Sequence, residues 1–154
     1  MPSDKPAGMD RDGEISLGLL PSLLGYALRR AQVAVFQNFT EVVGASELTP
    51  GQFGVLVVID ANPGLSQTQL GNALGIDRST VVAVIDRLET RGQVARQAAP
   101  NDRRSHALYL SDSGKTTLRR LTDRVRAHER AIARHLSAEE QARLIELLRC
   151  VARE

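Results

Sequence analysis

The stretch LSQTQLGNALGIDRSTVVAVIDRLETRG, residues 65–92, contains two short helical patterns separated by a tight turn. Ser66 is an expected N-cap with Gln69 completing a capping box, and Gly75 is typical of the left-handed residue that ends a helix. Asp77 is the expected N-cap of the second pattern. The sequence therefore predicts two helices joined by a short connection.

Beyond the second helix, two segments alternate between apolar and polar residues, as strands with one buried face do. They are QVARQ, residues 93–97, and HALYL, residues 106–110, and the segment APNDRRS joins them. We expect a β-hairpin with a long basic tip that carries Asp102, Arg103 and Arg104. Two short helices followed by a hairpin indicate a winged helix-turn-helix, whose second helix enters the major groove of DNA.

Longer helical patterns flank this unit. Thr49 and Gln52 predict a capping box with Pro50 at the first helical position. Further helices are expected at residues 20–42, 50–61, 112–135 and 138–151. The fold class is thus mainly α with a small β-hairpin wing, a winged helix-turn-helix with N- and C-terminal dimerisation helices.

The domain organisation follows from these elements. Residues 1–14, rich in Pro, Gly, Asp and Lys, are expected to be a disordered tail. Residues 15–154 are expected to form one domain. Within it, residues 48–110 are the winged helix-turn-helix lobe, and residues 15–46 and 111–154 are dimerisation helices. Their apolar stripes are more than a monomer of 154 residues can readily cover, which favours a homodimer over helices that fold back on one another.

Charge is unevenly distributed along the chain. The whole chain has 20 Lys and Arg residues and 18 Asp and Glu residues. Residues 77–120 hold nine basic and five acidic residues, whereas residues 1–47 hold four basic and six acidic residues. A basic winged helix-turn-helix predicts a double-stranded DNA partner. The alternative is a winged helix that contacts protein, and the two differ in salt dependence because DNA binding releases counterions.

Composition bounds the remaining functions. A single cysteine excludes an internal disulfide, and no signal peptide or membrane-spanning apolar run is visible, so we expect a cytoplasmic protein without a membrane partner. Cys150 is expected to be a buried structural thiol, with thiol sensing as an alternative. Zinc sensing through His106, His128 and His135 is a further alternative. No catalytic motif is present, so we expect no enzyme activity, cofactor or metal.

Three segments resemble the MarR family of bacterial transcriptional regulators: LTPGQFGVLVVI, the helix-turn-helix from Leu65 to Arg96, and DRRSHALYLSDSG. The resemblance spans about Leu17 to Val151 and implies a homodimer on a pseudo-palindromic operator. By that resemblance Arg104 enters the minor groove and Arg103 contacts phosphate. Asp102 is suited to hold an Arg side chain by an ion pair.

The recognition helix departs from the family pattern, because many members have Thr–Arg where this chain has Val82–Ala83. Base readout is therefore expected to rely on the helix start and on apolar contacts with thymine methyl groups. Phosphate contacts are expected from the start of the preceding helix and from Arg87. The predicted DNA-binding residues are Gln67, Thr68, Arg78, Ser79, Thr80, Val82, Ala83, Arg87, Asp102, Arg103 and Arg104.

The resemblance also implies a cleft for a small anionic aromatic effector. Aromatic and basic residues of the first two long helices suit such a ligand, because rings stack on it and guanidinium groups pair with its carboxylate. The predicted effector-binding residues are Tyr26, Arg29, Arg30, Phe36 and Phe53. Ordinary core packing of the rings is the alternative. We expect a repressor released from its operator by an aromatic acid or its CoA thioester.

Overall fold

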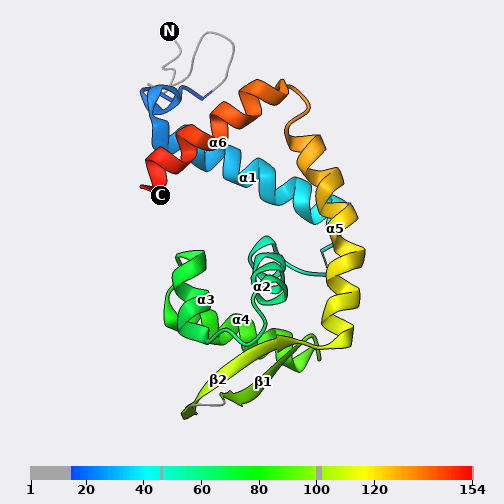
Figure 1. Ribbon diagram of the computed structural model, residues 1–154. Coiled ribbons are helices and arrows are strands. Elements are labelled where there is room, and N and C mark those ends of the chain that lie inside the picture. The colour runs from blue at the N-terminus through cyan, green and yellow to red at the C-terminus, as the bar shows by residue number, and fades with distance from the viewer. Residues whose placement is uncertain (1–14, 46, 100–101, 154) are drawn as a thin grey trace, which may run out of the picture. The chain divides into compact units, whose positions relative to one another are not determined.

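The computed structural model describes residues 15–45, 47–99 and 102–153, with the side chains of residues 102–105 left out. The expected disordered tail lies outside these residues. The elements are a 3₁₀ helix Leu20–Ser22, α1 Leu24–Val43, α2 Pro50–Ala61, α3 Gln67–Leu74, α4 Arg78–Thr90, β1 Val94–Ala99, β2 Asp102–Leu110, α5 Asp112–Ile132 and α6 Ala138–Ala152 (Figure 1). The mainly α fold with a two-stranded antiparallel sheet is confirmed.

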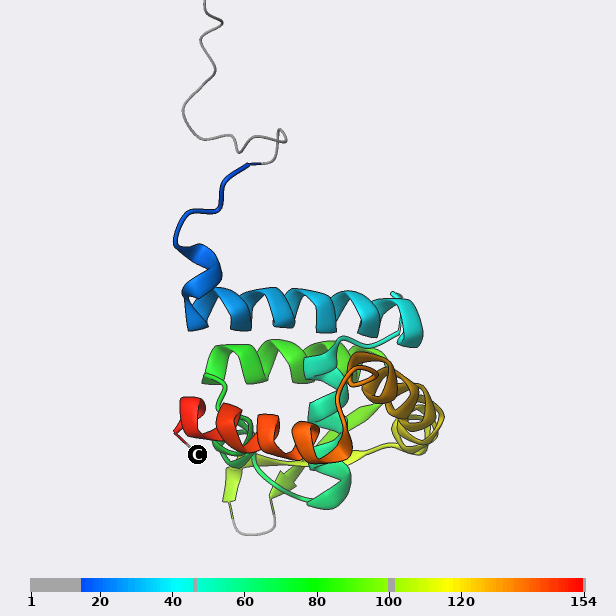
Figure 2. The same cartoon turned by 90° about the horizontal axis from the view of Figure 1, so that it is seen from above.

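The chain divides into two compact units, Met1–Phe36 and Gln37–Glu154, and the boundary falls inside α1. Helix α1 is nevertheless continuous over 20 residues (Figure 2). The first helix begins later than the expected residue 20, because Leu23 has an extended backbone that separates the 3₁₀ helix from α1, which starts at Leu24. No helix among the described residues is long and apolar enough to cross a membrane.

The helix starts of the second unit follow the capping signals in the sequence. Thr49 and Gln52 form a reciprocal capping box at α2, and Ser66 and Gln69 form another at α3. Each box satisfies two backbone N–H groups that a helix leaves without partners. Asp77 accepts a hydrogen bond from the backbone N–H of Thr80 at the start of α4. The predicted helix-turn-helix is therefore confirmed.

An aliphatic core holds the second unit together. Side chains from the second half of α1, from α2 to α5 and from both strands meet in it, and Phe39, which is 4% exposed, packs there as an aromatic member. Its least exposed members are Leu56, Ile59, Leu70, Ile85, Leu88, Leu108, Leu121, Val43, Val55 and Val81. This burial fixes α3 and α4 against α2, so the polar faces of α3 and α4 remain outside the core.

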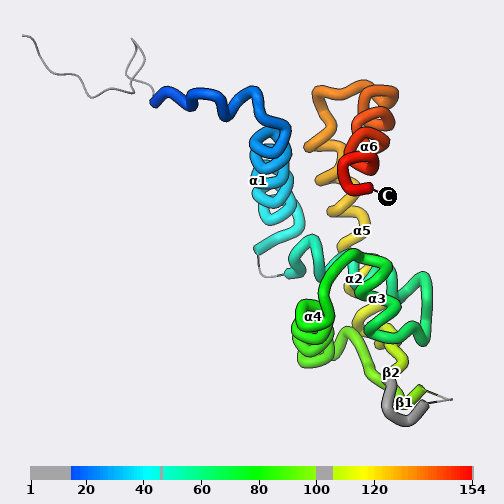
Figure 3. Tube along the Cα trace, turned by 90° about the vertical axis from the view of Figure 1, so that its left-hand side faces the viewer, coloured from blue at the N-terminus to red at the C-terminus, as the bar shows by residue number. Residues whose placement is uncertain are grey.

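The hairpin differs from its prediction at the tip. The strands pair in regular antiparallel register from Val94 with Leu110 to Ala98 with His106, and an irregularity then brings Ala99 opposite Asp102. Both strands are thus longer than the alternating segments, and the residues of the predicted basic tip are the first residues of β2. In Figure 3 the labelled strands lie at the same end of the second unit as α3 and α4. The prediction was wrong because backbone pairing continues where apolar alternation stops.

Gly114 anchors α5 to the turn after α4. A Cβ atom at this position would lie 2.0 Å from the carbonyl oxygen of Gln93, so only glycine fits without backbone movement. Ser111 caps α5, donates its backbone N–H to the same Gln93 oxygen, and donates its hydroxyl to the Gly92 carbonyl. The base of the hairpin and the start of α5 therefore form one rigid junction.

We expect Gly114→Ala to destabilise the protein by about 3 kcal/mol. This value is at the upper end of the usual cost of an added methyl group in a packed core, because the obstructing atom belongs to the backbone. Thermal unfolding should then occur roughly 5–10 °C lower. Gly54→Ala in α2 is the matched control, since its Cβ would have no neighbour within 4 Å, and it should be neutral or stabilising. Equal melting temperatures for the two variants would contradict this junction.

Candidate nucleic-acid interface

A tight turn joins the end of α3 to the start of α4. Gly75 has a φ of +63°, a left-handed conformation that ends α3. The backbone N–H of Ile76 then donates to the carbonyl of Gly71 over 3.0 Å. The turn leads directly to Asp77, the N-cap of α4.

A hollow of about 430 Å³ lies between the two helix starts and β2. Its lining residues are Ser66, Gln67, Thr68, Gly71, Asn72, Ile76, Arg78, Val81 and His106. Three of them, Gln67, Thr68 and Arg78, are predicted DNA contacts, and the backbone N–H groups of the α3 start add partial positive charge. The hollow is polar and suits a phosphate of a DNA backbone.

The predicted contacts on the two helices share one property, which is access to solvent. Six of them are exposed: Thr68, Arg78, Ser79, Thr80, Ala83 and Arg87. Gln67 and Val82 are half-buried. The structure thus leaves most of these residues open to solvent and brings three of them, Gln67, Thr68 and Arg78, to one hollow. The contacts of all of them with DNA stay predictions.

Asp77 organises the first turn of α4. Its Oδ1 accepts from the Ser79 hydroxyl at 2.5 Å and from the Thr80 backbone N–H at 3.0 Å. Its Oδ2 accepts from the Thr80 hydroxyl at 2.6 Å. The hydrogen bonds from Ser79 and Thr80 hold the pKa of Asp77 well below its usual range, because they stabilise the ionised form.

Arg96 joins β1 to α3 and α4. It was not among the site residues predicted from the sequence. Its guanidinium donates from Nε to Gln67 Oε1 at 2.9 Å, from one terminal nitrogen to Asp86 at 2.5 Å, and from the other to Glu89. Burial opposes its charge, but the bonds to Asp86 and Glu89 raise the pKa of Arg96 above its usual value. Arg96 therefore ties β1 to both helices of the helix-turn-helix.

The signal for Arg96 was present but incomplete. Asp86 and Glu89 are three residues apart, so they lie on one side of α4, and a nearby cation stabilises such a pair of carboxylates. Which arginine supplies it depends on the hairpin register, which places Arg96 opposite Leu108. The pairing of the two strands, which a local sequence pattern does not reveal, therefore decides that Arg96 is this cation.

We expect Arg96→Ala to weaken binding to a preferred operator about tenfold, because α4 loses its tie to β1 and two unpaired carboxylates remain beside the interface. Arg96→Lys should recover only part of the affinity, since an ammonium cannot form the fork of three bonds. Binding to operator and to random DNA would be compared by fluorescence anisotropy. A loss no greater than that of Arg126→Ala, which removes an exposed α5 arginine, would exclude the positioning role.

The hairpin contributes the remaining predicted contacts. Asp102, Arg103 and Arg104 are the first residues of β2. Their side chains lie outside the described part of the structure, so the minor-groove and phosphate roles stay predictions. His106 follows on the same strand, is exposed, and lines the hollow beside α3, a position that the sequence did not indicate.

Comparison with known proteins agrees with this geometry. Residues 46–105 match the MarR family model. A protein from Thauera aromatica, described as "Putative transcriptional regulatory protein for hcr operon", is 38% identical over 151 residues, which cover 97% of this chain and 90% of the relative. The chain belongs to the MarR family.

Solved structures extend the likeness of this MarR-family protein. The transcriptional repressor CouR bound to a 23-mer DNA duplex is 44% identical, with a TM-score of 0.84 over 90% of this chain and 99% of CouR. CouR bound to p-coumaroyl-CoA is 42% identical, with a TM-score of 0.84 over 92% of this chain and 99% of CouR. PcaV from Streptomyces coelicolor with its natural ligand is 34% identical, with a TM-score of 0.83 over 90% of this chain and 97% of PcaV.

The protein is therefore a DNA-binding transcriptional regulator of the MarR family. The family model and the relatives named above describe regulators, and none of their descriptions names an enzymatic activity. The surface formed by α3, α4 and the hairpin is accordingly its candidate DNA interface. The family resemblance seen in the sequence is confirmed.

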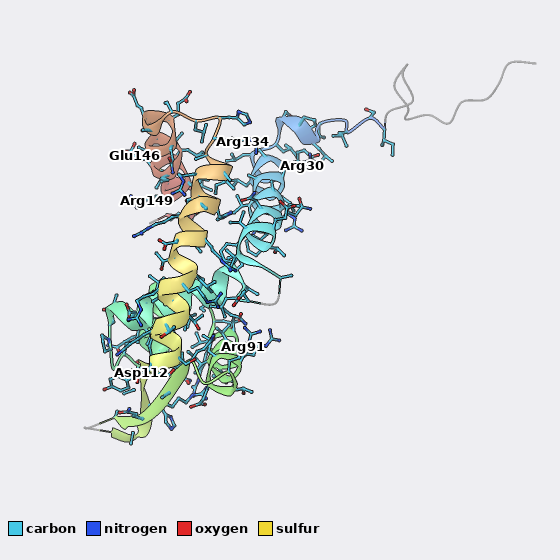
Figure 4. All side chains as sticks on the ribbon, turned by 90° about the vertical axis from the view of Figure 1, so that its right-hand side faces the viewer. Arg30, Arg91, Asp112, Arg134, Glu146 and Arg149 are labelled. Carbon is cyan, nitrogen blue, oxygen red and sulfur yellow. The ribbon has the colours of Figure 1, made fainter. Side chains whose placement is uncertain are left out.

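The predicted effector residues of this regulator fall in both units. Tyr26, Arg29, Arg30 and Phe36 lie on the part of α1 in the first unit, and Phe53 lies on α2 in the second. Arg30 projects from α1 (Figure 4), and Arg29 donates to Gln32 at 3.3 Å. Phe53 packs against the core, whereas 48% of Phe36 is exposed. These residues remain candidates for an effector site.

The prediction of a buried structural thiol at Cys150 was wrong, and His128 was named only for the alternative of zinc sensing. Cys150 is exposed rather than buried, because α6 has no buried residue within the chain. His128 is buried, its Nδ1 lies 2.8 Å from Asn38 Oδ1, and its ring meets that of Phe39 edge to face. Within the described residues, no group of three or more His, Cys, Asp and Glu side chains is arranged to hold a metal.

A second set of arginines joins α5 and the end of α4 to the last residue of α1 and to the segment that follows it. Arg120 makes two bonds of 2.8 Å to the carboxylate of Glu47, and Arg91, at the end of α4 (Figure 4), donates to the Glu47 carbonyl. Arg124 donates to the carbonyl of Val43 at 2.9 Å. The hydrogen bond from Arg120 lowers the pKa of Glu47. The recognition helix is thereby linked to the chain that follows α1.

Proposed function

We propose that this MarR-family protein is a dimeric repressor that leaves its operator when it binds the CoA thioester of an aromatic acid. The observation that carries the proposal is the likeness to CouR, which has been solved both with a DNA duplex and with p-coumaroyl-CoA. More than 40% of residues are identical in each comparison, over at least 90% of the chain. We therefore favour the thioester over the free acid.

Exposed apolar side chains support a homodimer. Helix α6 contributes five of them, Leu144, Ile145, Leu147, Leu148 and Val151, each at least 40% exposed in the single chain. A second group lies before and at the start of α1: Ile15, Leu17, Leu19, Leu20, Leu23 and Leu24. A soluble monomer rarely leaves so many large apolar side chains in water, so a second copy is the natural cover.

A dimer requires a matching DNA site. Two recognition helices related by two-fold symmetry bind half-sites about one helical turn, roughly 34 Å, apart. The operator is therefore a pseudo-palindrome, and each half-site meets one α4 and one hairpin. We assign the base and phosphate contacts to the residues predicted on α3, α4 and β2.

The effector is proposed to act through the part of α1 that lies in the first unit. Tyr26, Arg29 and Arg30 are three and four residues apart, so their side chains leave α1 on one side. The rings of Tyr26 and Phe36 suit an aromatic acyl group, and the guanidinium groups of Arg29 and Arg30 suit the phosphates of CoA. Phe53, in the second unit, stays a candidate of its own. Binding favours a helix spacing that does not fit the operator, with a coupling energy of about 1–3 kcal/mol.

The direct test is release of a labelled operator duplex, followed by fluorescence anisotropy. We expect p-coumaroyl-CoA to weaken operator binding about tenfold, and p-coumaric acid and CoA alone to have little effect. The double variant R29A/R30A should bind operator normally and require about ten times more thioester for release. Release by the free acid alone would reassign the effector class, and insensitivity to all three compounds would contradict ligand-responsive repression.

A further inference from the structure

We propose that Ser79 and Thr80 contact DNA only as hydrogen-bond acceptors, and so select exocyclic amino groups, adenine N6 or cytosine N4, in the major groove. The inference rests on the proposed DNA-binding role of α4. It goes beyond that role because it states which chemical groups of the bases the start of the helix can read. The argument depends on the bonds that both hydroxyls already make within the protein.

Both hydroxyl hydrogens are directed at Asp77. The Ser79 hydroxyl lies 2.5 Å from Oδ1, and the Thr80 hydroxyl lies 2.6 Å from Oδ2. The low pKa of Asp77 keeps the carboxylate ionised at neutral pH, and an ionised carboxylate accepts hydrogen bonds but donates none. Each hydroxyl must therefore be the donor in its bond to Asp77.

A hydroxyl has one hydrogen and two lone pairs. With the hydrogen used, Ser79 and Thr80 offer only lone pairs to a ligand, and both residues are exposed at the start of α4. In the major groove the hydrogen-bond donors are adenine N6 and cytosine N4, whereas purine N7, guanine O6 and thymine O4 are acceptors. Phosphate oxygens are acceptors too, and the charge of Asp77 repels them. The amino groups are the partners that remain.

The start of α3 offers a hydrogen-bond donor, whereas the start of α4 offers acceptors, and this contrast strengthens the inference. Arg96 has only donors, so the Gln67 atom that it contacts at 2.9 Å must be the amide oxygen. The free part of the Gln67 side chain is then its NH₂ group, a donor that suits phosphate oxygen. Hydrogen bonds within the protein thus leave a free donor at the start of α3 and free acceptors at the start of α4.

The test begins with selection of the preferred duplex from a random-sequence pool. In that duplex, purine would replace each adenine and 2-pyrimidinone each cytosine, so that only the exocyclic amino group is lost. Duplexes with 7-deazapurines, which lack the N7 acceptor, are the matched controls. We expect amino-group removal at one or two positions per half-site to weaken wild-type binding about fivefold.

Two variants assign this effect to the hydroxyls. Thr80→Val keeps the shape and the backbone bond to Asp77, and Ser79→Ala removes the other hydroxyl. Sensitivity to amino-group loss should disappear at the corresponding position in one or both variants, whose melting temperatures report folding. The proposal is overturned if the wild type shows no such sensitivity, if both variants retain it, or if they lose sensitivity to N7 removal instead. Failure to enrich any duplex would instead reject DNA binding itself.

Discussion

Arg104→Ala is expected to weaken operator binding by about 30-fold or more and to leave the fold, the dimer and effector binding intact. A base- or groove-directed arginine contributes about 1–3 kcal/mol, and a two-fold complex contains two copies. The effect arises because the narrow minor groove has a strong negative potential that attracts a guanidinium group. Anisotropy with the selected operator, over a range of salt concentrations, measures the loss.

The control for this variant removes an arginine outside the proposed interface. Arg126→Ala changes the charge equally, but Arg126 is an exposed α5 residue that pairs with Asp123. It should bind operator within about twofold of wild type. Operator affinity that is unchanged by Arg104→Ala at moderate salt would remove the hairpin from the DNA interface.

Leu148→Asp is expected to convert the dimer to a monomer and, with it, to abolish measurable operator binding. Leu148 lies on the apolar surface of α6 and is 40% exposed in the single chain. The substitution places one carboxylate from each copy in the proposed interface, where desolvation of an unpaired charge costs several kcal/mol. Sedimentation equilibrium should give a mass near the 16.8 kDa of one chain.

Leu148→Met is the matched control, because it conserves volume and apolar character and should remain dimeric. Circular dichroism checks that both variants keep their helices. The α6 surface would be excluded from the dimer interface if Leu148→Asp retained twice the chain mass at micromolar concentration. A wild-type monomer would remove the pseudo-palindromic operator as well.

Local signals in the sequence were sufficient for most of the fold. Thr49, Ser66 and Asp77 act through the backbone of their own helix starts, so their roles can be read without knowledge of the tertiary structure. The same holds for Gly75, whose left-handed φ ends α3. Helix positions in the DNA-binding lobe were therefore predictable to within a residue or two.

Features that depend on pairing between distant segments were not predictable in this way. Arg96 meets Gln67 only because the hairpin folds back over α3, and the strands extend to Ala99 and Asp102 by backbone bonds that no apolar pattern marks. The exposure of Cys150 was missed for a related reason, since a helical stripe looks the same whether its cover is the same chain or a second copy.

The sequence predicted where the candidate site lies, and that location stays a prediction; which atoms of the site donate and which accept hydrogen bonds could not be predicted. The sequence placed Ser79, Thr80 and Gln67 at the interface, and the structure shows which of their hydrogen-bonding atoms Asp77 and Arg96 already occupy. The direction of a hydroxyl bond follows from the ionisation of its partner. Spacing along the chain carries no such information.

The central claim, specific binding of duplex DNA by two copies of the chain, is tested most directly by titrating the selected operator and a scrambled duplex at several salt concentrations. We predict that two chains bind each operator, about a thousandfold more tightly than the scrambled duplex, with an affinity that falls steeply as salt increases. Equal affinity for both duplexes, or one chain per operator, would contradict the account.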